Sequence, residues 1–166
     1  MRPRGASDGC PGRDEVFIPD QQLLGKVGSG WGQVTSELAY ERSGPERWLS
    51  TFLLVRAWAS GDAGSAEVSL GATVARLRAF HQMSLAIAGA LQAGMDADLP
   101  AAMVKVLGTR FEGDIAERAH LAATVIDGST YSEAVNQALL QRPGFTLRGG
   151  TNEILRGVIA RGLGMR

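Results

Sequence analysis

Residues 143–156 read PGFTLRGGTNEILR, and this stretch ends one pattern and starts another. Gly149 and Gly150 interrupt the backbone just before a segment with helical apolar spacing. Thr151 suits the N-cap of that helix, because its hydroxyl can accept a hydrogen bond from a first-turn amide. Glycines at this place let another group approach the backbone, and the positive end of a helix dipole favours an electron-rich ligand. The stretch therefore predicts a final helix that starts with a simple cap, with a ligand contact, or with both.

Upstream of this stretch, apolar residues recur at the spacing of long helices. The pattern predicts four further helices, over about 31–59, 65–94, 99–127 and 131–141. Asp98-Leu99-Pro100 is typical of a helix start, Gly128 of a helix stop, and Pro143-Gly144 of a break. Long helices with short connections favour an all-α, up-and-down bundle that resembles a four-helix bundle.

The first thirty residues have a different composition. Residues 1–14 are rich in Gly, Pro, Arg and Asp, and we expect a disordered tail there. Residues 16–18 are apolar and stop at a proline, which fits one strand or a short extended arm, and 20–30 have the glycines of a loop. Trp31 follows this loop, and we interpret it as an anchor in the core. The predicted organisation is a tail (1–14), an arm and linker (15–30) and a helical domain (31–166).

Charge and composition exclude several classes of function. Lys and Arg together number 17, as do Asp and Glu, so neither nucleic acid nor an acidic membrane surface is favoured as a partner. Cys10 is the single cysteine, which fits a reducing cytoplasm. The N-terminus lacks a signal peptide pattern, and no apolar run reaches membrane-spanning length. His81 and His120 have no partners at metal-ligand spacing, so we expect no metal site. Together these features lead us to expect a cytoplasmic protein.

Glu41 and Arg42 lie in the first predicted helix, close to a proline. Pro45 has no amide hydrogen, so the carbonyl of Glu41 loses its usual helical partner. A kink or a loosened turn at Glu41 is the expected result. These residues alone leave two interpretations open: a charged surface pair beside a proline kink, or a functional site.

Two segments together resemble the flavin-dependent acyl-CoA dehydrogenases. Residues 149–154 read GGTNEI, and with the amphipathic helix that follows they are similar to the C-terminal signature of that family. Residues 16–44, from VFIP to LAYERSG, are similar to the family's passage from its middle β-domain into the first helix of its C-terminal helical domain. The resemblance covers residues 15–166 and implies that 15–30 are a remnant of the β-domain. The family's N-terminal domain and most of its β-domain have no counterpart here.

The resemblance also implies a set of site residues. The reaction needs a carboxylate that removes the proton α to the thioester carbonyl while a hydride leaves the β carbon for FAD, and a buried glutamate suits this general base. Most members carry the glutamate just before the Gly-Thr pair, where this chain has Gly149. A minority, resembling the isovaleryl-CoA type, carry it on the first helix of the C-terminal domain, and Glu41 matches that position. Arg42 matches the arginine that follows this glutamate in those members, and we expect Arg42 to bind the substrate.

Thr151 and Glu153 match positions that touch the flavin nucleotide in this family. The simpler interpretation is that Thr151 caps the last helix and Glu153 interacts with its dipole, and both interpretations can hold together.

Two functions are compatible with these features. The first is an FAD-dependent acyl-CoA dehydrogenase, present as a partial chain that we expect to be inactive alone and to assemble as a homo- or hetero-oligomer through its helical domain. The second is a non-catalytic helical oligomerisation module that pairs with a larger flavoprotein subunit. Either one predicts exposed apolar side chains where other domains would dock.

Overall fold

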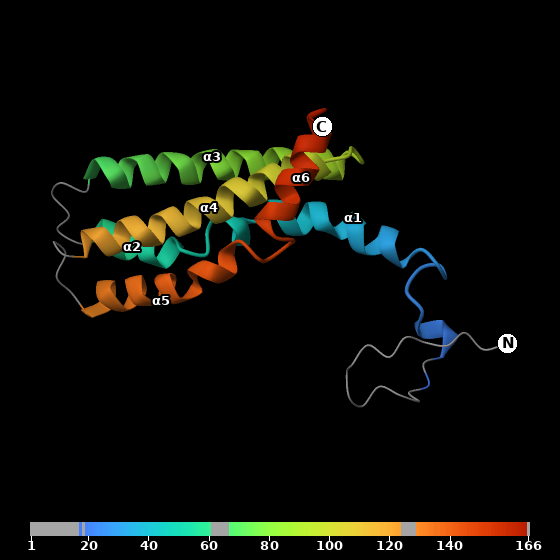
Figure 1. The fold of residues 1–166 in the computed structure, drawn as a ribbon, viewed down its shortest axis with the longest axis horizontal. Coiled ribbons are helices and arrows are strands. Elements are labelled where there is room, and N and C mark those ends of the chain that lie inside the picture. Colours follow the sequence, from blue (N-terminus) through green and yellow to red (C-terminus); the bar gives the residue numbers. More distant parts are fainter. Residues whose placement is uncertain (1–16, 18, 61–66, 124–128, 166) are drawn as a thin grey trace. The chain divides into compact units, whose positions relative to one another are not determined.

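All regular structure in the described part of the chain is helical (Figure 1). The computed structural model describes residue 17 and residues 19–60, 67–123 and 129–165. The α-helices are α1 (Gly30–Ser43), α2 (Phe52–Ser60), α3 (Glu67–Gln92), α4 (Asp98–Ala122), α5 (Ser129–Phe145) and α6 (Asn152–Gly162). Two short 3-10 helices cover Asp20–Gln22 and Pro45–Arg47. The predicted all-α class is therefore confirmed.

The chain divides into two compact units, residues 1–34 and 35–166. In the first, the side-chain amide of Gln33 donates to the carbonyl of Leu24 at 3.0 Å. Trp31 is 81% exposed, so its interpretation as a core anchor is wrong. The predicted tail (1–14) and most of the apolar arm (16–18) lie outside the described residues.

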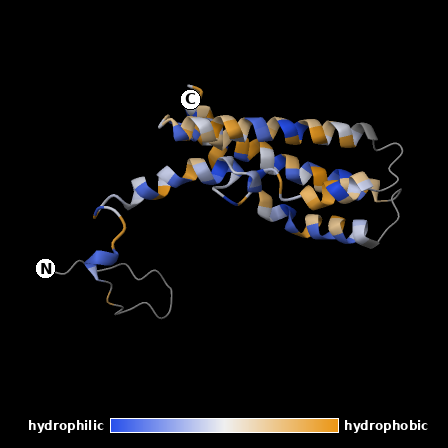
Figure 2. Ribbon diagram, turned by 180° about the vertical axis from the view of Figure 1, so that it is seen from behind, coloured by the Kyte–Doolittle hydropathy of each residue, from blue (hydrophilic) through white to orange (hydrophobic). Residues whose placement is uncertain are grey.

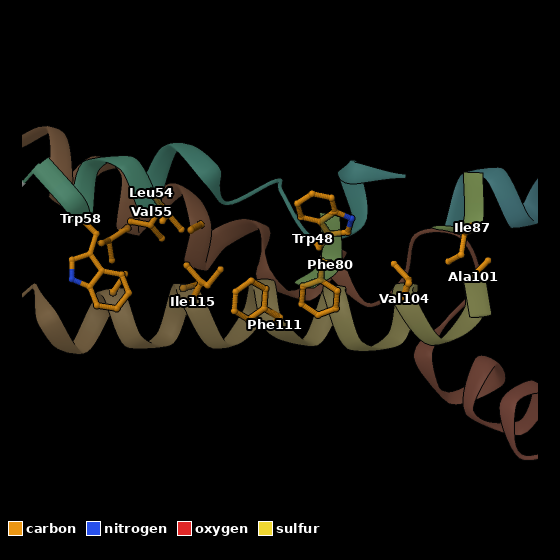
Figure 3. Packing of buried hydrophobic residues seen from close by; sticks show 14 of the residues in the cluster. Trp48, Leu54, Val55, Trp58, Phe80, Ile87, Ala101, Val104, Phe111 and Ile115 are labelled. Carbon is orange, nitrogen blue, oxygen red and sulfur yellow. The ribbon is translucent and has the colours of Figure 1, made fainter. Parts of the chain in front are cut away.

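The second unit is an up-and-down bundle of α2, α3, α4 and α5, with α6 packed on α4 (Figure 1). Helix α4 contacts each of the other helices named here. Apolar and polar residues interleave along the bundle helices, as amphipathic helices require (Figure 2). The α4 face in the core carries Val104, Phe111 and Ile115. Leu54, Val55 and Trp58 of α2 lie toward Ile115, and Phe80 of α3 lies beside Phe111 (Figure 3). None of the described helices is long and apolar enough to cross a bilayer.

The single helix predicted over 31–59 is wrong, because residues 44–51 interrupt it. Helix α1 ends at Ser43, and Gly44 adopts an extended conformation with ψ of 157°. An extended residue is what a following proline favours, and Pro45 then starts the short 3-10 helix. The proline is thus the cause, as predicted, but the interruption follows Glu41, which stays in the last turn of α1.

A helix end predicted near 141 is also wrong, because α5 continues to Phe145 with Pro143 inside it. A proline so close to the C-terminal end removes only one helical hydrogen bond. Phe145 is 3% exposed, and the guanidinium of Arg148 lies 5.5 Å from the centre of its ring. Burial of this ring favours the extra turn. The predicted stop at Gly128 falls outside the described residues.

Candidate functional site

The turn between α5 and α6, residues 146–151, has a backbone that requires glycine. Gly149 and Gly150 have φ of +66° and +91°, a region that other residues rarely adopt. The amide of Asn152 donates to the carbonyl of Thr146 at 3.1 Å and closes the turn. Thr151 is the N-cap of α6, with its hydroxyl accepting from the amide of Ile154 at 3.4 Å. The predicted cap is therefore confirmed.

A buried lysine of α4 holds this turn. Lys105 is fully buried, and its Nζ donates to the carbonyls of Thr146 and Gly150 and to Oδ1 of Asn152, at 2.9, 2.6 and 2.7 Å. Burial lowers the pKa of Lys105 to about 8, and the positive charge of Arg47 acts in the same direction. Lys105 is not among the site residues predicted from the sequence. The available signal was a lysine four residues after Ala101, on the apolar face of a helix.

Arg42 holds the same turn from α1. Its Nε donates to the carbonyl of Gly149 at 3.1 Å, joining residues 107 positions apart. Two cations from different helices therefore bind three carbonyls of the turn, those of Thr146, Gly149 and Gly150. This arrangement fixes the conformation of the segment that carries the family-like signature.

A second buried charge, also missed from the sequence, connects the turn to α2. Glu112 is fully buried and accepts from the amide of Ser50 at 2.6 Å and from Nη2 of Arg148 at 3.2 Å. Burial raises the pKa of Glu112, while the hydrogen bonds from Ser50 and the charge of Arg148 act against that rise. Glu112 thus ties the residues before α2 to the residue before Gly149.

Glu41 is held by Arg47, which lies in the 3-10 helix that follows α1. Nη2 of Arg47 is 2.7 Å from Oε1 of Glu41, and Nε of Arg47 donates to the main-chain carbonyl of Glu41 at 2.9 Å. The Arg47 side chain is 6% exposed, whereas that of Glu41 is 45% exposed. The carboxylate is therefore anchored but open on one side, rather than buried by the described residues.

The fold brings Glu41 to the side of Gly149. A Cβ placed on Gly149 would lie 3.4 Å from Oε1 of Glu41 and 3.6 Å from Cζ of Arg47. The two positions at which the family resemblance places a carboxylate, 41 and 149, thus lie next to each other in space. A side chain at 149 would therefore begin in contact with the carboxylate of Glu41.

The other two predicted residues lie at the start of α6. Thr151 is half-buried and Glu153 is exposed, and Gly150 between the turn and the helix is exposed as well. A group approaching here meets glycine backbone, a hydroxyl and a helix N-terminus, which suits a nucleotide ligand such as FAD. The residues present therefore fit that cofactor in the chemistry of their donors.

Comparison with known families bears on this geometry. The model of one family, described as "Acyl-CoA dehydrogenase, C-terminal domain", matches residues 61–164, which are more than half of the chain. The chain belongs to this family. The matched part of this acyl-CoA dehydrogenase domain includes Lys105, Glu112 and the whole turn, whereas Glu41 and Arg42 precede it. Neither the curated proteins nor the solved structures give a significant match.

Proposed function

We propose that this chain works as the C-terminal part of an acyl-CoA dehydrogenase, with Glu41 as the general base. The observation that supports it best is the 3.4 Å between Oε1 of Glu41 and the Cβ position of Gly149. A carboxylate from α1 occupies the space that a side chain at 149 would reach, so the base is relocated rather than lost.

In the proposed reaction, Glu41 removes the proton from the carbon α to the thioester carbonyl. A double bond forms between the α and β carbons, and the proton remains on the carboxylate. The hydride that leaves the β carbon needs an acceptor, which bound FAD would supply. Arg42, already bonded to the carbonyl of Gly149, lies beside the carboxylate and would face the substrate.

The nucleotide side of the site is proposed at the start of α6. The hydroxyl of Thr151 and the exposed backbone of Gly150 would contact the flavin nucleotide, with Glu153 in the first turn. Arg42 and Lys105 bind the carbonyls of the turn from behind, so this backbone is already arranged before any ligand binds.

The test is reduction of the flavin by acyl-CoA in the flavin-loaded assembly of this chain. We expect acyl-CoA to bleach the absorbance near 450 nm in the absence of oxygen. Glu41→Gln should slow this step by about a hundredfold or more, because a general base contributes about 10²–10⁴-fold. Glu37→Gln is the matched control, one turn earlier on α1 and also exposed, and should keep the wild-type rate. Full activity of Glu41→Gln would contradict the assignment of the base.

The alternative is a non-catalytic helical module that assembles with a larger flavoprotein subunit. Exposed apolar side chains fit either function, among them Leu140 (79%), Leu147 (61%) and Ile154 (64%). A chain that never binds flavin, alone or in its assembly, would favour the module. A yellow assembly that acyl-CoA reduces would exclude it.

A further inference from the structure

Pro45, just after α1, leaves a carbonyl at the end of that helix without its backbone donor, and a side chain replaces the donor. Because proline lacks an amide hydrogen, the carbonyl of Glu41 has no helical donor four residues ahead. A carbonyl of this kind is unfavourable where it lacks both a donor and water. Nε of Arg47 donates to that carbonyl at 2.9 Å, so the side chain replaces the missing amide.

The same guanidinium also binds the carboxylate of Glu41. Its Nη2 lies 2.7 Å from Oε1, so Arg47 contacts both ends of one residue, the main chain and the side chain. Arg42, next to Glu41 in sequence, directs its Nε to the carbonyl of Gly149 instead. Because one planar guanidinium binds both the main-chain carbonyl and the carboxylate of Glu41, it restricts the side chain relative to its own backbone.

Arg47 is itself fixed by its surroundings. The following residue, Trp48, stacks on Phe80 with ring centres 6.3 Å apart and donates from Nε1 to Oγ of Ser84 at 3.0 Å. The backbone of α4 lies directly against the segment: a Cβ on Gly108 would be 2.6 Å from the carbonyl oxygen of Arg47. The packed bundle therefore holds Arg47 in place, and the guanidinium of Arg47 in turn holds Glu41.

We propose that Arg47 is a positioning residue, which holds the carboxylate of Glu41 beside Gly149 in the orientation that proton removal needs. The role of Arg47 in proton removal rests on the proposed function, whereas its contact with Glu41 does not. A surface ion pair offers the contrast: Arg142 and Glu117 lie 2.9 Å apart with side chains 46% and 57% exposed, and a pair of that kind contributes little.

The kinetic test compares Arg47→Gln and Arg47→Lys with the control Arg142→Gln. At saturating acyl-CoA, Arg47→Gln should slow flavin reduction by about ten- to a hundredfold, because misplacement by about 1 Å costs about that much. The KM for acyl-CoA should change less than about twofold, since a residue that orients the base affects the chemical step rather than uniform binding. Arg47→Lys keeps one charged donor and should recover part of the rate, and Arg142→Gln should keep all of it.

A second readout separates this inference from the proposed function. In the full chain with carbon-13 in the glutamate carboxyl groups, the Glu41 resonance is the one that Glu41→Gln removes. Arg47→Gln should shift that resonance, and Arg142→Gln should leave it in place. If acyl-CoA never reduces the flavin but the resonance shifts, the proposed function fails while the contact stands. An unshifted resonance, or a wild-type rate in a folded Arg47→Gln protein, would overturn the inference. If Arg47→Gln does not fold, Arg47→Lys carries both measurements.

Discussion

At the scale of single residues, Lys105 shows how a charge is accommodated inside an apolar helix face. Its ammonium has three hydrogens and meets three oxygens, so every donor is used. Burial and the charge of Arg47 disfavour the ammonium, and the three acceptors offset that cost. The side chain therefore serves the turn before α6 more than it serves the stability of α4.

Lys105→Met should lower the free energy of unfolding by about 3 kcal/mol at pH 7, because it leaves the oxygens of Thr146, Gly150 and the buried Asn152 without this donor. Arg110→Met, exposed on the same helix, should change it by less than about 0.5 kcal/mol. Urea unfolding followed by circular dichroism measures both. Equal effects of the two variants would contradict this role of Lys105.

The same pair of proteins should differ in pH dependence. The pKa of Lys105 is lowered to about 8 in the folded chain from 10.5 when unfolded, so the unfolded chain binds more protons between these pH values. The free energy of unfolding of the wild type should therefore rise relative to Lys105→Met from about pH 8 to about pH 10.5. If the difference in free energy of unfolding between the wild type and Lys105→Met narrows over this pH range, the hydrogen bonds keep the ammonium charged and the pKa of Lys105 is not lowered.

At the scale of secondary structure, the interruption between α1 and α2 is a packed feature of the fold. Ser84 donates from Oγ to the carbonyl of Ser43 at 2.6 Å and accepts from Nε1 of Trp48, which joins the end of α1 to α3. Gly108 provides the space on α4 for this segment. A straight helix over 31–60 would forgo these contacts.

Gly108→Ala tests the close approach between α4 and residues 47–48. Its Cβ would lie 2.6 Å from the carbonyl oxygen of Arg47 and 2.9 Å from Cβ of Trp48, so a packed segment must move. The expected loss in free energy of unfolding is about 1–3 kcal/mol.

Gly89→Ala on α3 is the control for the intrinsic helical preference of alanine. Nothing lies within 4 Å of its Cβ position. This variant should gain about 0.5–1 kcal/mol. Thermal unfolding would compare the two, and a gain for Gly108→Ala would contradict the packing argument.

At the scale of the whole molecule, the fold superposes two positions that are distant in sequence. The end of α1 and the turn before α6 meet because the 3-10 helix that follows α1 contacts α4, α6 also contacts α4, and Arg42 bridges the two segments. The shared location of Glu41 and Gly149 predicts that one carboxylate can replace the other.

Moving the carboxylate tests that prediction. In the Glu41→Gln background, Gly149→Glu should recover at least about tenfold of the lost rate of flavin reduction, as a partial share of a general base's contribution. Recovery stays partial, because the φ of +66° at 149 is strained for glutamate by about 1–2 kcal/mol. Gly164→Glu, at a φ of +76° with open space around it, should recover nothing. If a folded Glu41→Gln/Gly149→Glu protein recovers no activity, a carboxylate at position 149 does not replace the one at position 41.

Local pattern alone was sufficient for the all-α class, for α3, α4 and α6, for the role of Pro45 in interrupting the first predicted helix, for the Thr151 cap and for the family signature. Each of these depends on residues within a few positions of one another, which is the range over which helical spacing and capping act. Where tertiary packing competes with such local rules, prediction failed. Pro143 lies inside a helix whose end buries Phe145, and Trp31 is exposed despite its size.

The tertiary structure alone decided the composition of the site. Lys105, Glu112 and Arg47 gain their partners across the bundle or across an irregular segment, at distances along the chain that no periodicity encodes. The family resemblance gives 41 and 149 as alternative positions for one carboxylate, and this chain has Glu41 and Gly149 there. Their proximity follows from helix packing, because contacts between distant segments form only when the whole core closes.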